Sequence, residues 1–235
     1  MERGRRIQAG LSGPGGIGGA GTLAWLETRR SRREFEDRAI PKETLKRLLQ
    51  AAITAPSNTN RQPWRFAVVT KKETRKQIAE AVRTRAEEIK AIIARGHHAE
   101  DYANYGDFFH EPLENAAAII IPQWREYPDL IANLITSGGG DPTQYHTASS
   151  MQAELCSTSA AIMALLLQAH AEGLGACWMA GPMIAKPTIE SLLNIHPPFQ
   201  MLGAIALGHP KNNPTPPGRK NIDKTIQWFE DEEGE

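Results

Sequence analysis

The sequence is poor in cysteine, with Cys156 and Cys177 as its two cysteines in 235 residues. They allow one disulfide at most, and neither lies in a Cys-x-x-Cys or zinc-finger spacing. This excludes a disulfide-rich scaffold and a zinc-binding module. We expect both thiols to be buried as small apolar side chains. Such sparse usage fits a reducing compartment, so we expect a cytoplasmic protein.

The chain also lacks a surplus of charge and a long apolar run. It carries 27 Lys and Arg against 27 Asp and Glu, so no overall positive field favours a nucleic-acid partner. The most apolar run, residues 160–167, is too short to cross a membrane. The basic residues at the start of the chain are not followed by the apolar stretch of a secretory signal.

Composition divides the chain into three parts. Residues 1–21 are rich in glycine and lack periodicity, so we expect a disordered tail. Residues 13–18 match the pattern G-x-G-x-x-G, but no apolar strand precedes them, as a dinucleotide-binding turn requires. We expect a single domain over residues 22–220 and a C-terminal extension over residues 221–235.

Hydrophobic periodicity predicts helices over 23–28, 41–53, 73–95, 149–172 and 188–194, and strands over 64–70, 116–121, 176–179 and 199–208. Helices and strands do not alternate regularly, which favours an α+β fold over a doubly wound sheet. Ser149 and Gln152 are expected to form a capping box. The helix after them is apolar nearly all round and should be buried in the core or at a subunit interface.

A basic cluster precedes the second helix. It holds Arg29, Arg30, Arg32 and Arg33, with Ser31 between them. Like charges this close repel one another unless an anion neutralises them, and guanidinium groups with a hydroxyl suit a phosphate dianion. The alternative is a solvated surface turn.

An amide-rich loop lies between Pro56 and Pro63. Its carboxamides, on Asn58, Asn60 and Gln62, match the donors and acceptors on the edge of a flat heterocycle. With the basic cluster, this loop offers the two halves of a flavin-nucleotide site. The alternative is a surface turn, because Pro, Ser and Asn all favour turns.

Two later segments complete the pattern. Gly173 and Gly175 precede a short strand, and Gly181 follows it, where a residue without Cβ would let the backbone approach a ligand closely. The first two glycines are also explained as the end of a helix. Farther on, Gly208-His209-Pro210 leads to Arg219 and Lys220, which alone would be only a basic tail.

These four segments, in this order, resemble the FMN-dependent nitroreductase family over residues 23–220. The resemblance implies a mixed β-sheet flanked by helices, in an intertwined homodimer with two FMN sites at the subunit interface. It implies that the C-terminal extension wraps the partner. Arg32 departs from the family pattern, which usually has an apolar residue there.

The resemblance also implies the roles of the site residues. The FMN phosphate would be held by Arg29, Arg30, Ser31 and Arg33, helped by Arg219 or Lys220. The flavin would be lined from the partner subunit by Pro56, Ser57, Asn58, Asn60 and Gln62. Near the flavin N5 would lie Met179, Ala180 and Gly181. Some family members carry a Glu where Ala180 stands, so in this chain the contacts at N5 would come from the backbone alone.

The expected activity is that of an FMN-dependent oxidoreductase that uses NADH or NADPH to reduce nitroaromatic, quinone or similar small electron-poor substrates. No catalytic side chain is needed, because the flavin carries the chemistry. Two alternatives remain open. One is other flavin chemistry on the same fold, such as dehalogenation, cofactor biosynthesis or dehydrogenation. The other is a non-enzymatic flavin- or deazaflavin-binding module.

Residues 97–147 are expected to form a variable lid over the site, most of residues 123–147 being a mobile loop. Six potential metal ligands occur near its start: His97, His98, Asp101, Asp107, His110 and Glu111. They lack the spacing of a known metal motif, so we expect no metal. The aromatic residues of this region could stack on a substrate or pack within the lid.

Overall fold

The computed structural model describes residues 19–97, 100–215 and 217–230. Most of the expected disordered tail and its G-x-G-x-x-G pattern lie outside the described residues. The expectation is wrong for residues 19–21, because helix α1 spans Gly19–Thr28 and therefore begins earlier than predicted.

Five strands form the sheet, and their pairing is antiparallel. They are β1 (Trp64–Val69), β2 (Ala118–Arg125), β3 (Gly175–Met179), β4 (Phe199–Met201) and β5 (Ala204–Gly208). The order is β1-β2-β5-β3, and β4 pairs with β2 beside β5. A parallel element enters through the bridge between Ser31 and Ala176, at the free edge of β3. The α+β class is confirmed.

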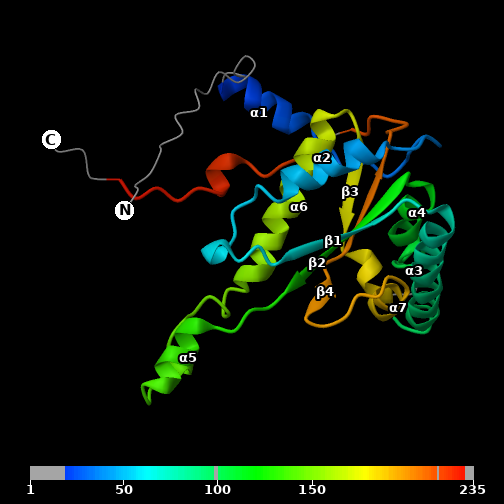
Figure 1. Cartoon of the computed structure of the whole chain (residues 1–235). Helices are drawn as coiled ribbons and strands as arrows, with labels where there is room; N and C mark the ends of the chain where they lie inside the picture. The colour runs from blue at the N-terminus through cyan, green and yellow to red at the C-terminus, as the bar shows by residue number, and fades with distance from the viewer. Residues whose placement is uncertain (1–18, 98–99, 216, 231–235) are drawn as a thin grey trace.

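Helices cover both faces of the sheet (Figure 1). On one face pack α2 (Lys42–Ala52) and α6 (Ala153–Ala171), and on the other α3 (Lys72–Ile93), α4 (Asp107–Asn115) and α7 (Lys186–Leu192). Residues of β2 alternate between two hydrophobic cores: Ile120 faces α2 and α6, whereas Ile119 and Ile121 face α3 and α7. The sheet is therefore buried on both sides.

The second strand continues through Pro122, where the sequence predicted its end. The pairing of β2 shifts by one residue between its contacts with β5 and with β4, as at a β-bulge. The carbonyl of Pro122 accepts a hydrogen bond from Leu202 N at 2.8 Å, at this bulge. Proline is tolerated inside a sheet at such irregular positions, which explains the wrong boundary.

The same bulge splits the predicted strand 199–208 into β4 and β5. Gly203 lies between them with φ 77°, and a Cβ there would approach Met179 O to 2.5 Å. Trp178 Nε1 donates to Leu202 O at 3.1 Å, which fixes the bulge from β3. A residue other than glycine at position 203 is therefore strained twice, by its φ and by its neighbours.

Two expectations about residues 123–152 are wrong. The expected mobile loop contains a helix, α5 (Leu130–Ser137), which Asp129 caps by accepting Ala132 N at 3.1 Å. Asp129 also accepts hydrogen bonds from the Thr147 hydroxyl and from Ser149 N. Because Ser149 is used in this way and Gln152 has a left-handed backbone, the predicted capping box does not form and α6 begins only at Ala153.

The carboxylate of Asp129 therefore closes the base of the excursion 130–148. Its hydrogen bonds, first the one from Thr147 and then the one from Ala132 N, hold the pKa of this carboxyl well below its ordinary value. Beyond that base, Leu130, Ile131 and Leu134 are each more than half exposed.

Among the helices of the described residues, none is both long and apolar enough to cross a membrane.

We predict that Gly203→Ala lowers the free energy of unfolding by more than the about 1–3 kcal/mol that a left-handed backbone conformation alone costs a residue with a Cβ. Gly139→Ala is the matched control, because Gly139 has φ 78° but nothing within 4 Å of the added Cβ. Urea unfolding followed by tryptophan fluorescence measures both. Equal losses in the two variants would show that the crowding at the bulge relaxes without cost.

Candidate functional site

The basic cluster is attached to the free edge of the sheet. Ser31 forms the parallel bridge to Ala176, and Arg32 N donates to Ala176 O at 3.0 Å. Four residues on, Phe35 is fully buried and bridges to Pro210. The segment is therefore held to β3 at one end and to the chain just after β5 at the other, which fixes the backbone positions of the arginines between them.

The charges of the cluster are not neutralised. In the described part of the chain, no ion pair joins Arg29, Arg30, Arg32 or Arg33 to a carboxylate. Two of them donate to backbone carbonyls instead: Arg30 Nη1 to Arg29 O at 2.9 Å and Arg32 Nη1 to Asn212 O at 2.5 Å. Burial lowers the pKa of Arg29, and the charges of Arg219 and Arg30 lower it further. An anion at this place would relieve the repulsion.

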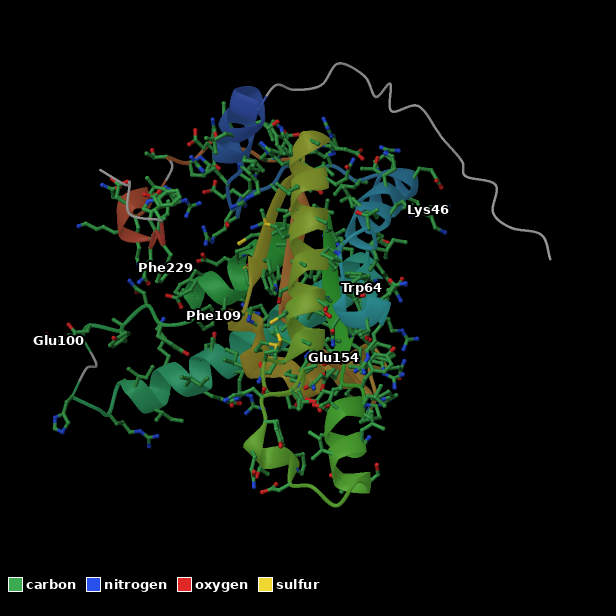
Figure 2. All side chains as sticks on the ribbon, turned by 90° about the vertical axis from the view of Figure 1, so that its left-hand side faces the viewer. Lys46, Trp64, Glu100, Phe109, Glu154 and Phe229 are labelled. Atoms are coloured by element: carbon green, nitrogen blue, oxygen red, sulfur yellow. The ribbon has the colours of Figure 1, made fainter. Side chains whose placement is uncertain are left out.

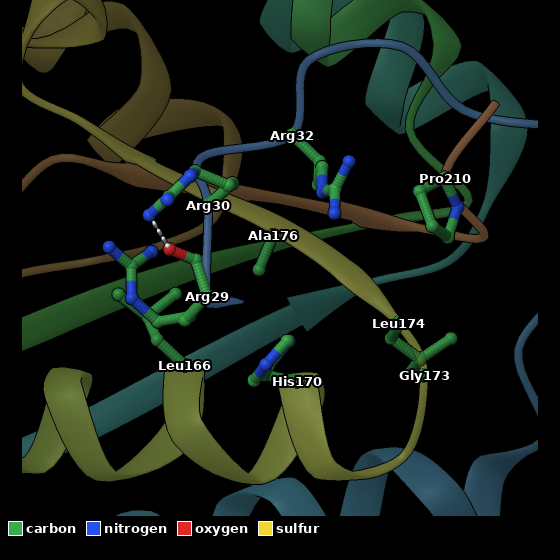
Figure 3. Close-up of a pocket in the computed structure, with 9 residues that line it drawn as sticks. All are labelled: Arg29, Arg30, Arg32, Leu166, His170, Gly173, Leu174, Ala176 and Pro210. Atoms are coloured by element: carbon green, nitrogen blue, oxygen red, sulfur yellow. Dashed lines mark hydrogen bonds between the residues drawn. The ribbon is translucent and has the colours of Figure 1, made fainter. Parts of the chain in front are cut away.

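A cavity of about 160 Å³ opens between the cluster and the C-terminal end of α6. Figure 3 shows its lining, in which Arg29, Arg30 and Arg32 face Leu166 and His170. None of the described residues that line this cavity is a carboxylate. Its volume suits a phosphate-sized group rather than a whole ligand of about 300 Å³ or more.

The C-terminal segment brings one further arginine to the cluster. Arg219 lines a second cavity, of about 400 Å³, together with Arg30 and Glu27. The structure thus brings Arg219 to the cluster, as the sequence predicted, although it lies nearly two hundred residues farther along the chain. Lys220 is exposed.

The two cysteines differ. Cys177 lies buried on β3 behind the cluster, and burial raises the pKa of its thiol while Arg33, Ser31 and Arg29 act in the opposite direction. Ser31 and Arg33 are therefore close to this thiol. Cys156 is exposed, so the prediction that it is buried is wrong. It lies on α6, on the side turned away from the sheet.

The amide loop forms a short 3-10 turn, Asn58–Asn60, packed against the other end of α6. Asn58 N donates to Ser157 Oγ at 3.2 Å, and Gln62 N donates to Ser57 Oγ at 3.0 Å. Three of its residues that are not glycine have positive φ: Thr59, Asn60 and Gln62. Backbone strain of this kind clusters at functional sites, which supports a ligand-binding role for the loop.

A buried ion pair fixes the loop, and the sequence did not reveal it. Arg61 Nη1 donates to Glu154 Oε1 at 2.8 Å, and the carboxylate side chain is 6% exposed. Tyr127 also donates its hydroxyl proton to Arg61 O at 3.2 Å. The sequence does show that Glu154 is a charged residue in the first turn of a mostly apolar helix, but it does not show that Arg61 is its partner.

The two halves of the predicted site do not meet within one chain. Ser157, beside the amide loop, and Leu166, beside the basic cluster, are nine positions apart on α6, about 14 Å at 1.5 Å per residue. Figure 2 shows α6 running from Glu154 at one end to α1 at the other. One chain therefore presents two half-sites at opposite ends of one helix.

The end of β3 offers a second explanation for one predicted site residue. Met179 is buried, Ala180 is exposed, and Gly181 begins a 3-10 turn. A Cβ on Gly181 would come within 2.2 Å of the Phe109 ring, so packing of α4 explains this glycine. The interpretation that the missing Cβ serves ligand approach is not needed. Phe109 in turn contacts Phe108 and Tyr105 edge-on, which favours packing as the role of these aromatic residues.

The expected lid region divides into two parts. Its first part packs on α3, where Lys90 Nζ donates to Asp107 Oδ1 at 2.8 Å. Within α4, His110 Nδ1 lies 2.9 Å from Glu114 Oε1. In the described residues, no three His, Cys, Asp or Glu side chains gather as a metal would need. His98 lies outside the described residues. The second part, with α5, extends away from the sheet (Figure 1).

Comparison with known proteins agrees with this geometry. The family model described as Nitroreductase family matches residues 26–209. An iodotyrosine deiodinase of Haliscomenobacter hydrossis is 32% identical over 109 residues, which cover 46% of this chain and only 48% of that protein. A protein of Archaeoglobus fulgidus described as an NADH dehydrogenase/NAD(P)H nitroreductase is 28% identical over 196 residues, 81% of this chain and 86% of the relative.

Solved structures share the fold. A BluB-like flavoprotein of Clostridium difficile has a TM-score of 0.78 at 20% identity, over 89% of this chain and 99% of its own. A nitroreductase of Desulfovibrio desulfuricans in complex with FMN has a TM-score of 0.61 at 23% identity, over 88% and 96%. The family match spans the basic cluster, the amide loop, all five strands and α6, and the chain therefore belongs to the nitroreductase family.

Proposed function

We propose that the protein is a cytoplasmic FMN-dependent oxidoreductase that uses NADH or NADPH to reduce small electron-poor substrates such as nitroaromatics and quinones. The observation that carries this proposal is the basic cluster: its Arg29, Arg30 and Arg32 line a phosphate-sized cavity whose described lining holds no carboxylate. When bound, FMN supplies hydride chemistry that no side chain can supply. The nicotinamide partner rests on the names of relatives such as the protein from Archaeoglobus fulgidus.

In this proposal the cluster holds the terminal phosphate through charge-assisted hydrogen bonds. The proposed ligands are Arg29 and Arg30, which line the cavity, with Ser31 and Arg33 of the same segment and with Arg219 and Lys220 from the C-terminal segment. Burial of Arg29 makes its contribution strong, because a partly desolvated charge is screened less by water and salt. These residues bind and orient the cofactor, and none of them transfers a proton.

The flavin ring itself is placed between two chains. Because the amide loop and the basic cluster lie at opposite ends of α6, a two-fold axis that sets two α6 helices antiparallel would bring the loop of one chain to the cluster of the other. Exposed apolar groups support a homodimer: Met163 on the outer side of α6 is 42% exposed, and Trp228 and Phe229 in the C-terminal extension are 72% and 87% exposed.

In such a dimer, the amide loop lines the flavin with Pro56, Ser57, Asn58, Asn60 and Gln62. The backbone at Met179, Ala180 and Gly181 lies at the flavin edge, and Ala180 adds no acidic side chain there. The apolar α5 and the parts of residues 97–147 that lie outside β2 cover the substrate space and exclude water from it. The C-terminal extension wraps the partner chain.

A second candidate is reductive dehalogenation. The 32% identity with an iodotyrosine deiodinase over about half of each chain favours it specifically. Both activities would use the same phosphate site and the same two-chain arrangement, so they differ only in what the lid admits. The substrate therefore separates them, and the cofactor does not.

The first test is the cofactor and its turnover. Purified protein reconstituted with FMN is expected to show the two visible absorbance bands of a flavin. It is also expected to oxidise NADH or NADPH when a quinone or a nitroaromatic is present. Iodide release from 3-iodotyrosine without turnover of quinones would favour the second candidate. A protein that binds FMN and turns over none of these substrates would contradict the proposed enzyme.

The second test asks whether each site is made from two chains. Arg29→Ala/Arg33→Ala removes the phosphate half-site, and Asn58→Ala/Asn60→Ala removes the flavin half-site. Each variant alone is expected to bind FMN at least about tenfold more weakly, the effect of about 1.4 kcal/mol. A hybrid dimer of the two variants would keep one intact site and bind one FMN per dimer with the affinity of the unmodified protein.

Differently tagged variants, co-expressed and purified on both tags, give this hybrid dimer. Calorimetric titration with FMN then counts its intact sites. The matched control is an equal mixture of the two separately purified homodimers, measured before subunits exchange. If the hybrid dimer binds no better than its parents, each site lies within a single chain and the two-chain arrangement is wrong.

A further inference from the structure

One residue of the cavity beside the basic cluster has no place in the predicted site. His170 lies near the end of α6 and lines the cavity together with Arg29, Arg30 and Arg32 (Figure 3). Its Nε2 is 2.8 Å from Thr28 Oγ1, and its ring lies 5.2 Å from that of Trp25, both in α1. His170 therefore joins α1, which precedes the basic cluster in the sequence, to α6.

Hydrogen-bond geometry favours one position of the ring proton. The Thr28 hydroxyl lies 2.7 Å from Trp25 O, to which it can donate its single proton. While it donates there, it accepts from His170 at 2.8 Å, the arrangement in which Nε2 of the imidazole is the donor. Nδ1 is then the nitrogen that gains a proton when the ring becomes charged.

The surroundings disfavour the charged form of this ring. Burial lowers the pKa of His170, and the charges of Arg29 and Arg32 lower it further, against a hydrogen bond with the Trp25 carbonyl. Arg30 adds a third positive charge to the cavity lining. The nearest acid along α6, Glu172, is paired with Arg47 at 2.6 Å and accepts from Gln168 at 3.1 Å. Among the described residues that line the cavity, no carboxylate opposes the arginines.

We propose that His170 is a ligand of the terminal phosphate and takes up a proton when that phosphate binds. This inference rests on the proposed function, because the phosphate is that of FMN. A dianion in the cavity offsets two of the three arginine charges that line it and adds an acceptor for the ring, so the imidazolium form is stabilised relative to the empty cavity. The ring then adds a cation and a donor to those of the arginines.

Linkage gives the direction of the pH dependence. Binding of the phosphate raises the pKa of His170, so by reciprocity protonation of His170 strengthens phosphate binding. The contribution of His170 to affinity is therefore full at acidic pH and is lost as pH rises through the pKa of the complex. Protonation of the phosphate itself near pH 6 acts in the opposite direction, but equally in every variant.

The first experiment follows the His170 ring directly. Protein labelled with ¹⁵N in its histidine rings is titrated with pH by NMR, alone and with FMN, riboflavin or inorganic phosphate. We expect the pKa of His170 to rise with FMN and with phosphate and to stay unchanged with riboflavin, which lacks the phosphate. The same pKa with all three additions would overturn the proposal.

The second experiment measures FMN affinity in variants. For His170→Gln, the ratio of its Kd to that of the unmodified protein should grow from about 1 at pH 8.5 to about tenfold at pH 5.5, the range of one charge-assisted hydrogen bond. Thr28→Val loosens the contact with α1 but keeps the imidazole, so it should keep the pH dependence. His196→Gln, in the turn after α7 and outside the cavity lining, is the matched control.

The outcomes separate this inference from the proposed function. A pH-independent ratio in a protein that binds FMN would show that His170 only holds α1 in place, and the inference alone would fail. No FMN binding, with a His170 pKa that still responds to inorganic phosphate, would keep the phosphate site and reject the flavin enzyme. Loss of pH dependence in Thr28→Val would also contradict a direct role of the ring.

Discussion

Mutual repulsion within the basic cluster is the constraint on which the rest of the site depends. The chain places Arg29, Arg30, Arg32 and Arg33 in one extended segment and brings Arg219 to them from the far end of the domain. The bridge from Ser31 to β3 and the burial of Phe35 supply the free energy that holds these charges together. The folded protein is thus prepared for an anion before one arrives, and binding need not order the arginine backbone.

Helix α6 contacts the amide loop, the core and the basic cluster at successive places along its length. Its first turn holds the amide loop through Glu154 and Ser157, and its last turns face the basic cluster through Leu166 and His170. Its inner side belongs to the core with α2, whereas Met163 on its outer side stays exposed. One helix therefore serves as core, as spacer between half-sites and as the surface on which a second chain would complete each of them.

The sequence predicted what depends on local chemistry. The long helix α3 and the strand β1 follow from periodicity, whereas the arrival of Arg219 at the cluster was implied by the resemblance to a known family. It could not predict that Cys156 is exposed, because an apolar helix does not tell which side faces the core and which a partner. Nor could it predict the pairing of Arg61 with Glu154 or the position of His170, because both are contacts between residues some 90 or more positions apart. The capping box at Ser149 failed because Asp129, twenty residues earlier, competes for the same backbone group.

The hydrogen bonds of the Asp129 carboxylate bear on which part of the sequence can change during evolution. Because this carboxylate joins both ends of residues 130–148 at one point, the length and sequence of that segment can change while the sheet and α6 stay as they are. If this segment covers the substrate space and the basic cluster holds the cofactor, as proposed, the part of the chain that meets the substrate is separated from the part that holds the cofactor. Selection could then alter which substrates are accepted by replacing one surface excursion, without changing the cofactor site beneath it.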